Sequence, residues 1–397
     1  MQAMCKKMIL LRPVGAALAV LTLACLMCVS CSSDDTLTSA TPDGTRRPMA
    51  FSVATADYAG TTRGTPSEDL YESMGLYAHI YDGTAGIWEN GGGSAPNFMV
   101  NAEVQNAGDV WMTVGAFDLM ESDRAVRFYA YYPFGHDSIS VTDETHANAP
   151  VITYKVPLDV DEQKDLLAGS SFDGSGSVRE YSTDTQNGDN PETVQLTLSH
   201  ILTAVKFQVG ECREVGRIKN ITITSILRQN SYSLQRKSDD SGFYGWAVKH
   251  KDEVPEYFSD FSIDLDKQIK VTQRDASNNV VPQEVTNNKQ WLLMIPQTLS
   301  EDSWLTISYY CGGSEHQMSV AIDGKKWQAG KKVTYTLNIL SLQRLMVNSS
   351  VEDWDAGLEF SDGRPTTATS IDSNTNVDDW DCPAENDKDI ASDDPRD

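Results

Sequence analysis

The residues that most often carry enzymatic chemistry are histidines, and this chain has six of them. They lie far apart in the sequence, at His79, His136, His146, His200, His250 and His316. No His-Glu-x-x-His pair occurs, so two imidazoles cannot reach one zinc ion from successive turns of a helix. A Gly-x-Ser-x-Gly turn and a Gly-x-x-x-x-Gly-Lys phosphate loop are also absent from the sequence. We therefore predict a protein that is not an enzyme and holds no metal or cofactor, with His200 as a structural residue between two strands.

Paired carboxylates could also do chemistry, because many glycoside hydrolases need only one acid and one base. Acidic clusters occur at Asp159-Val-Asp161-Glu162 and at Glu352-Asp353-x-Asp355. A chain with 57 acidic residues forms such clusters freely, so we interpret both as solvated loops. The first cluster also lacks the glycine of a calcium-binding loop.

Exposed tryptophans could stack on sugar rings, which would indicate a carbohydrate-binding protein. Trp88, Trp111, Trp246 and Trp304 all occupy strand-like positions. We expect these side chains to pack in the core, because that is the commoner use of tryptophan in a strand.

The first thirty residues have the pattern of an export signal. A short positive region precedes an almost wholly apolar run from Pro13 to Val29, which ends at Cys31-Ser-Ser-Asp-Asp. A cysteine in this place is typical of a bacterial lipoprotein, so we expect cleavage before Cys31 and a lipid on its thiol. Cys25 and Cys28 are alternative positions, but each would leave apolar residues at the mature end. The apolar run is marginal for a membrane span, which needs about 20 residues.

The net charge and the cysteines exclude some partners and some kinds of site. The formal net charge of −25 excludes nucleic acid as a partner held through its phosphates. Beyond the lipidation position the chain keeps Cys212, Cys311 and Cys382, which make neither a disulfide framework nor a metal site. A single disulfide between Cys212 and Cys311 is kept as an alternative.

The chain after the leader is predicted to form β-strands. Short apolar runs alternate with turn residues there, and long apolar stretches at helical spacing are absent. The clearest strand places Val333, Tyr335, Leu337 and Ile339 on one side and threonines and an asparagine on the other. This period of two predicts a half-buried antiparallel strand. Many such strands predict an all-β fold of two β-sandwiches in tandem, since about 330 residues exceed what one core usually serves.

Composition then divides the chain into five parts. Residues 1–30 are predicted to be a lipoprotein signal peptide and residues 31–48 a flexible tether poor in apolar side chains. An N-terminal β-sandwich is expected over residues 49–210 and a C-terminal one over residues 211–360. Residues 361–397 are rich in Asp and lack a periodic apolar pattern, which predicts a disordered acidic tail.

Several short motifs follow one another in a fixed order, and each alone is weak. They are Thr61-Thr62-Arg63, Phe128-Tyr-Ala-Tyr-Tyr-Pro133, Lys164-Asp-Leu-Leu-Ala-Gly169, Leu196-Thr-Leu-Ser-His200, Leu293-Met-Ile-Pro296, Lys326-Trp-Gln-Ala-Gly330 with Val333-Thr-Tyr-Thr-Leu337, and Ser350-Val-Glu-Asp-Trp354. Together with the lipoprotein leader, their order over residues 49–357 resembles the fimbrillin family of Bacteroidetes. That family comprises the subunits and accessory proteins of donor-strand pili, also called type V pili.

The resemblance implies two transthyretin-like β-sandwiches and a processing step. An arginine-specific protease would cut after Arg63, which makes Gly64 the new first residue and frees a strand of about residues 49–59. The groove that this strand leaves would be filled by an extended segment of another subunit. Arg46 and Arg47 form an alternative site, although a cut there precedes the strand and opens no groove. The other alternative is that Arg63 is a turn residue and the lipoprotein stays whole.

The resemblance also implies partners and a location. The donor segment would be about Leu342 to Trp354, although an acidic tail follows it and stalk, tip and anchor roles all stay open. Expected partners are other fimbrial subunits through donor-strand exchange, the outer membrane through the lipid, and a host or bacterial surface ligand. The location would be the cell outer membrane, and the fimbrium after processing. The alternative function is a surface lipoprotein that binds a glycan or host ligand and does not polymerise.

Overall fold

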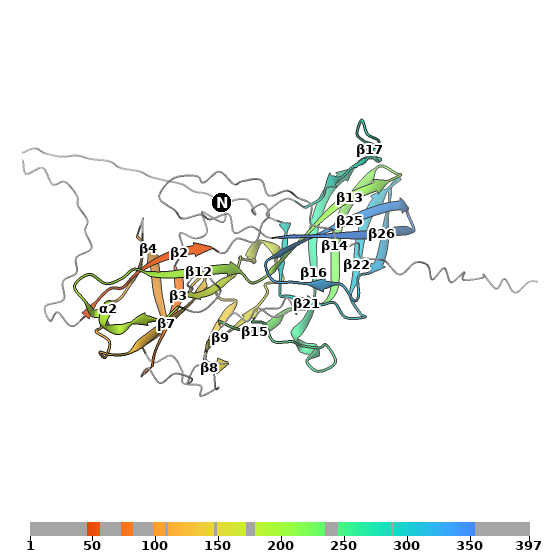
Figure 1. The fold of residues 1–397 in the computed structure, drawn as a ribbon. Coiled ribbons are helices and arrows are strands. Elements are labelled where there is room, and N and C mark those ends of the chain that lie inside the picture. The colour runs from red at the N-terminus through yellow and green to blue at the C-terminus, as the bar shows by residue number, and fades with distance from the viewer. Residues whose placement is uncertain are drawn as a thin grey trace, which may run out of the picture. The chain divides into compact units, whose positions relative to one another are not determined.

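The computed structural model describes residues 46–55, 73–81, 98–107, 110–146, 149–171, 179–234, 245–286 and 290–353. Almost every element in these ranges is a β-strand (Figure 1), so the expected all-β fold is confirmed. The helical elements there are α2 (Thr183–Asn187) and two 3-10 turns at Val160–Glu162 and Pro255–Tyr257. Among the described residues, no helix has the length and apolar character that a membrane crossing requires. The predicted signal peptide, most of the tether and the acidic tail lie outside these ranges.

The N-terminal half is built on a sheet that closes on itself. Its strands are β2 (Ala50–Thr55), β3 (Met74–Tyr81), β4 (Met99–Asn106), β5 (Trp111–Thr113), β7 (Ala125–Tyr132), β10 (Leu167–Ser171), β11 (Tyr181–Ser182) and β12 (Val194–His200). They follow the order β10-β12-β2-β5-β4-β3-β7-β11, and β10 also pairs with β7. Because β10 pairs with both β12 and β7, the seven strands from β10 to β7 in this order form a closed ring, and β11 lies outside it. Closure removes the free edges that would otherwise seek partners.

The inside of this ring is one apolar core. Alternate side chains of β7 point into it, namely Val126, Phe128, Ala130 and Tyr132. The intervening Tyr129 and Tyr131 belong to a second core cluster on the other face of the same strand. Because β7 is buried on both faces, its sequence is a nearly continuous apolar run rather than an alternating one.

The C-terminal half contains two larger sheets. One has the order β19-β13-β25-β26, with β20 also paired to β13, and the other has the order β16-β14-β22-β23. Their strands are β13 (Thr203–Cys212), β14 (Gly216–Leu227), β16 (Phe258–Ile269), β19 (Gln283–Glu284), β20 (Leu292–Met294), β22 (Trp304–Cys311), β23 (Ser314–Ala321), β25 (Lys331–Ser341) and β26 (Arg344–Asp353). The inward residues of both sheets belong to one core cluster, as expected for a sandwich.

Short strands complete the fold. β1 (Arg46–Arg47) pairs with β6 (Phe117–Asp118), and β8 (Ile139–His146), β9 (Ala149–Lys155) and β15 (Gln229–Ser233) form a three-stranded sheet. The two-stranded ribbons are β17 (Gln273–Arg274) with β18 (Val280–Val281) and β21 (Gln297–Thr298) with β24 (Lys326–Trp327). Cys212 and Cys311 are free thiols in this structure.

The strand pairing differs from a division of the chain at residue 210. Such a division assigns β13 to the N-terminal sandwich, but β13 pairs parallel with β25 and antiparallel with β20. The change of sheet therefore falls between β12 and β13, about ten residues earlier than expected. β15, from beyond residue 210, pairs with β9 from before it. The alternation within a strand shows which side is buried, but it does not name the partner strand.

Candidate strand-exchange site

The first long strand of the chain, β2, occupies an internal place in the N-terminal ring. It pairs in parallel with β12 from Phe51 opposite Val194 to Thr55 opposite Leu198. On its other side it pairs antiparallel with β5 at Ala50 and Phe51 (Figure 1). β2 is therefore a strand seated within the sheet, as the sequence predicted for this segment.

Side chains of β2 contribute to the core of the ring. Phe51 is fully buried and Val53 is 2% exposed, whereas Ser52 between them faces solvent. The ring of Phe51 meets the ring of Phe128 in a T-shaped contact, with centroids 5.5 Å apart. Such a contact adds to the hydrophobic gain because the positive edge of one ring faces the negative face of the other. Both buried positions of β2 would become an apolar slot if the strand left.

The backbone of the segment is tied to β5 as well. The amide of Met49 donates to Thr113 Oγ1 at 3.0 Å, and the amide of Thr113 donates to the carbonyl oxygen of Met49 at 3.1 Å. Removal of the segment would strip β12 and β5 of these backbone partners, and unpaired groups along an apolar slot are costly. These contacts make β2 an integral strand of the ring.

Arg46 and Arg47, the alternative processing site, lie in the paired strand β1. The guanidinium of Arg46 donates to both carboxylate oxygens of Asp118, at 2.6 and 3.0 Å. This hydrogen bonding lowers the pKa of Asp118, because it favours the charged carboxylate. Arg47 is half-buried and donates to the carbonyl oxygen of Gly188 at 2.6 Å. Both arginines are thus engaged in the fold. Cys31, Arg63 and Gly64 lie outside the described residues.

Three of the motifs singled out in the sequence are neighbours in the ring. β10 contains Leu167-Ala-Gly169 of one motif and pairs with β12 on one side and β7 on the other. Gly169 is required at this crossing, since a Cβ there would lie 1.8 Å from the carbonyl oxygen of Thr197. His200, at the end of β12, places Nδ1 2.7 Å from a carboxylate oxygen of Asp165, and both side chains are buried. These contacts fit the structural role predicted for His200.

The predicted donor segment corresponds to β26, which lies at an edge of its sheet and pairs with β25 alone. Leu345 is its one buried side chain, while Met346 and Val351 are exposed. The end of the strand is held by charge: Asp353 pairs with Lys331, and Glu352 lies 3.7 Å from Lys332 Nζ. β26 is therefore an edge strand that buries little apolar surface. Trp354, the last residue of the predicted donor, lies outside the described residues.

The four tryptophans divide differently from the prediction. Trp111 and Trp246 are buried as expected, and Trp88 lies outside the described residues. Trp304 is 45% exposed, so the expectation that it packs in the core is wrong. The signal that could have placed it was present, because Trp304 alternates with the buried Leu305 and Ile307. The expectation of burial rested on tryptophan as a residue type and not on this alternation.

In the described part of the chain, no group of three or more His, Cys, Asp or Glu side chains is placed to hold a metal ion. The features that stand out in the described residues are the strand β2, which lies inside a closed ring, and the strand β26, which lies at the edge of its sheet.

Comparison with known proteins identifies the family of this chain. A family model described as fimbrillin-like matches residues 85–354. The fimbrium subunit Fim1C of Phocaeicola vulgatus is 27% identical over 228 residues, which cover 55% of this chain and 58% of that protein. The crystal structure of a fimbrial protein from Bacteroides vulgatus ATCC 8482 has a TM-score of 0.52 at 19% identity, over 78% of this chain and 99% of that chain, and shows a shared fold. The chain belongs to the fimbrillin-like family.

Proposed function

We propose that this protein is a fimbrial subunit or accessory protein of a type V pilus that assembles by β-strand donation. The observation that carries the proposal is the internal place of β2, with Phe51 and Val53 in the core of a closed ring. Loss of β2 would leave backbone groups on β12 and β5 without partners beside an apolar slot. An extended segment from a second subunit restores both kinds of contact. Two fully buried apolar side chains at these positions would contribute about 3–6 kcal/mol.

Proteolysis after Arg63 is the proposed step that frees β2. This cut lies on the C-terminal side of β2, so the strand would remain attached to the ring by non-covalent contacts alone. A cut at Arg46 or Arg47 leaves β2 covalently joined to the ring and separates only the segment that carries Cys31. Arg47 is also half-buried and bonded to Gly188, which disfavours its entry into the pocket of a protease.

β26 is the proposed donor. On the face of β26 that carries the buried Leu345, Val347 is only half-buried and Val351 is 39% exposed, so little apolar burial holds the strand in its own sheet. The slot of β2 buries side chains at alternate positions completely, and a strand moving into it gains that burial. The exchange then trades one set of backbone hydrogen bonds for another while apolar contacts increase.

The proposed location follows from the leader and from the relatives. A lipid on Cys31 would hold the precursor at the cell outer membrane, and a new first residue at Gly64 would release it into the fimbrium, where it serves cell adhesion. Support comes from the fimbrillin-like family match and from a relative that is itself called a fimbrium subunit.

The test is treatment of the purified precursor with an arginine-specific protease, followed by a denaturing gel without boiling. We expect a mature start at Gly64 by mass and a ladder of species that resist dissociation. Arg63→Ala should abolish both, while the matched double variant Arg46→Ala with Arg47→Ala should keep both. A clean cut at Arg63 without a ladder would contradict assembly and favour the alternative, a surface lipoprotein that does not polymerise.

The donor is tested with a synthetic peptide of residues 344–353. An excess added during proteolysis should occupy the slot and suppress the ladder, because it offers the same backbone and side-chain pattern as β26. A scrambled peptide of identical composition is the control. If both peptides leave the ladder unchanged, β26 is not the donor.

A further inference from the structure

The outer face of the sheet β16-β14-β22-β23 carries two exposed aromatic side chains on one internal strand. Along β22, Leu305, Ile307 and Tyr309 are buried, and the residues between them face outward. Trp304 begins this outward row with 45% exposure, and Tyr310 ends it with 41% exposure. Six residue steps along the strand place the Cα atoms of Trp304 and Tyr310 about 20 Å apart. An internal strand holds such groups more rigidly than a loop does.

Hydroxyl and amide side chains, with the carboxylate of Asp264 on β16, cover the sheet between the two aromatic rings. One row across the four strands is Ser262, Thr222, Thr306 and Ser319. Within this row, Thr222 and Ser262 share a hydrogen bond of 2.6 Å, and Thr306 and Ser319 share one of 2.9 Å. The next row is Asp264, Asn220, Ser308 and Gln317. Each of these groups has further lone pairs or hydrogens that a polar ligand can use.

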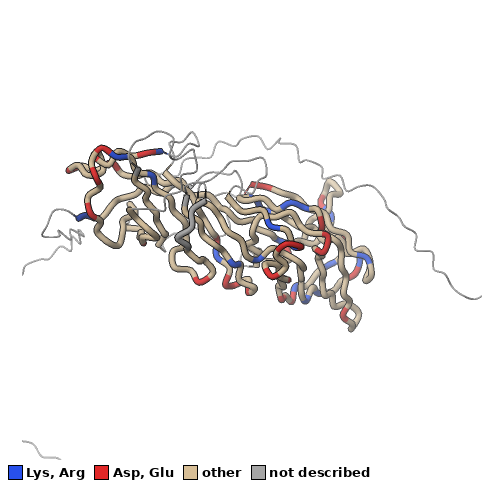
Figure 2. Tube along the Cα trace, turned by 90° about the horizontal axis from the view of Figure 1, so that it is seen from below, with Lys and Arg blue, Asp and Glu red and all other residues tan. Residues whose placement is uncertain are grey.

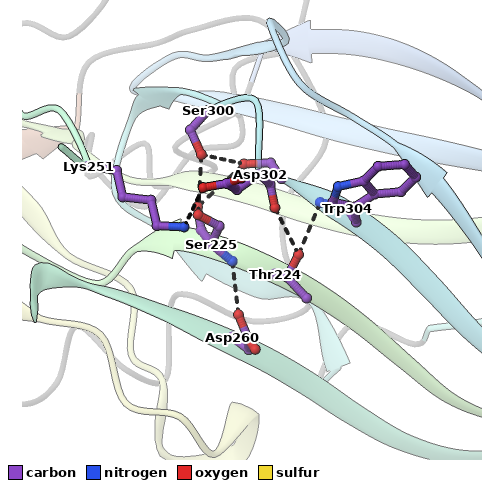
Figure 3. Close-up of polar contacts among 8 residues, drawn as sticks. Thr224, Ser225, Lys251, Asp260, Ser300, Asp302 and Trp304 are labelled. Atoms are coloured by element: carbon purple, nitrogen blue, oxygen red, sulfur yellow. Dashed lines mark hydrogen bonds and ion pairs between the residues drawn. The ribbon is translucent and has the colours of Figure 1, made fainter. Parts of the chain in front are cut away.

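A polar network holds the backbone around Trp304 at one end of this outer face (Figure 3). Its backbone amide donates to Thr224 Oγ1 at 3.1 Å, and Thr224 Oγ1 donates to the carbonyl oxygen of Asp302. The side chain of Asp302 in turn accepts a hydrogen bond of 2.7 Å from Lys251. Figure 3 shows the indole pointing away from this network. The residue opposite Trp304 on β23 is Ala321, whose small side chain leaves the ring face open.

The charges of this face decide the class of ligand. Arg217 and Lys219 both pair with Asp266, and Lys251 pairs with Asp302. Figure 2 shows the same interspersed arrangement of basic and acidic residues along the described chain. The same face carries the carboxylates of Asp264 and Glu315, so four carboxylates neutralise these three cations. An anionic ligand finds no spare positive charge among them, whereas an uncharged ligand meets no electrostatic penalty.

We propose that this face binds a neutral oligosaccharide. The apolar C–H faces of two pyranose rings stack on Trp304 and Tyr310, and the hydroxyl groups of the rings between them bond to the two polar rows. The separation of about 20 Å requires several linked sugar units, so a disaccharide reaches only one of the two rings. The site uses neither β2 nor β26, so binding does not depend on assembly and is measured on the uncleaved precursor.

Isothermal titration with cellohexaose, laminarihexaose, xylohexaose and mannohexaose tests the proposal, with a chondroitin sulfate hexasaccharide as charged comparator. We expect at least one neutral hexasaccharide to bind, and its disaccharide to bind at least about tenfold more weakly. Trp304→Ala should weaken binding about tenfold or more, Trp304→Phe less, and Tyr310→Ala several-fold. Leu158→Ala, at an equally exposed apolar residue outside this sheet, should leave the affinity unchanged, and all four variants should keep the thermal midpoint of the parent.

Three outcomes would overturn the proposal. One is the absence of binding to every neutral hexasaccharide, which would leave the aromatic pair without a sugar ligand. Another is binding that Trp304→Ala and Tyr310→Ala do not change, because the sugar would then lie elsewhere. The third is preferential binding of the sulfated comparator, which contradicts the neutralised charges of this face. None of these outcomes bears on the protease test for strand donation.

Discussion

Truncation of Phe51 to alanine tests whether β2 holds the N-terminal ring together. The side chain is fully buried and meets Phe128 in a T-shaped contact at 5.5 Å. Removal of a buried phenylalanine ring costs about 3–5 kcal/mol, because apolar contacts are lost and a cavity remains. The lost ring pair makes about 0.5–1.5 kcal/mol of that sum. We expect the uncleaved protein to lose stability in this range.

The assay is urea denaturation combined with amide exchange. With an m value of about 2–3 kcal/mol per molar urea, the midpoint of the transition that reports the N-terminal ring should fall by about 1–2 M. The protein has more than one core, so exchange of the β12 amides at Gln195 to Leu198 serves as the local probe. Their protection should fall together with the midpoint, because β12 pairs with β2.

Ser52→Ala is the matched control for Phe51→Ala. Ser52 lies on the same strand but faces solvent, so its truncation should change the free energy of unfolding by no more than about 0.5 kcal/mol. A loss of less than about 1 kcal/mol in the free energy of unfolding of Phe51→Ala would contradict this role of β2, and so would full amide protection of β12 in that variant. Either result would mean that β2 is not an integral strand of the ring and that its removal opens no groove.

Three further changes probe the packing around the site, each by denaturant or thermal unfolding. Gly169→Ala should unfold the ring more than any surface substitution, since its Cβ would lie 1.8 Å from the Thr197 carbonyl oxygen; a parent-like midpoint would contradict the close crossing. Tyr335→Phe removes the acceptor of the Trp327 indole N–H at 3.0 Å and should cost about 1–3 kcal/mol, whereas a neutral effect would show that the indole finds another partner. Burial lowers the pKa of His79, so the folded state binds fewer protons than the unfolded state and stability should fall as pH drops below about 6.5. His79→Gln should flatten that slope between about pH 7 and pH 5, and an unchanged slope would refute its cause.

Local patterns in the sequence were sufficient to predict strands and their buried sides. Val333, Tyr335, Leu337 and Ile339 are all buried, as their period of two indicated. The same pattern could not show that β25 lies between an antiparallel β26 and a parallel β13, since partner choice depends on contacts far apart in the chain. For the same reason, the alternation alone did not show that β13, which begins before residue 210, shares a sheet with β25.

The candidate site was predictable in part. Residues 49–59 were expected to include the first strand of the N-terminal sandwich, and the structure places Phe51 and Val53 of this segment in the core. The engagement of Arg47 with Gly188 was not foreseeable, because it joins residues 141 positions apart. Trp304 was missed although alternation along its strand placed it outside, so for an aromatic residue the periodic position is the better guide than the residue type.

The hold on β2 after processing has to come mainly from apolar burial. The ion pair between Arg46 and Asp118 anchors β1, but both side chains are more than half exposed, so salt and solvent screen it. Phe51 and Val53, in contrast, lie in a core that water does not reach. If strand exchange in the cleaved protein proceeds by release of β2, its rate should rise strongly in Phe51→Ala and change little between about 0.05 and 0.5 M salt. A rate that follows ionic strength, and not Phe51, would mean that the β1 contact controls release and that the apolar slot is not the decisive part of the site.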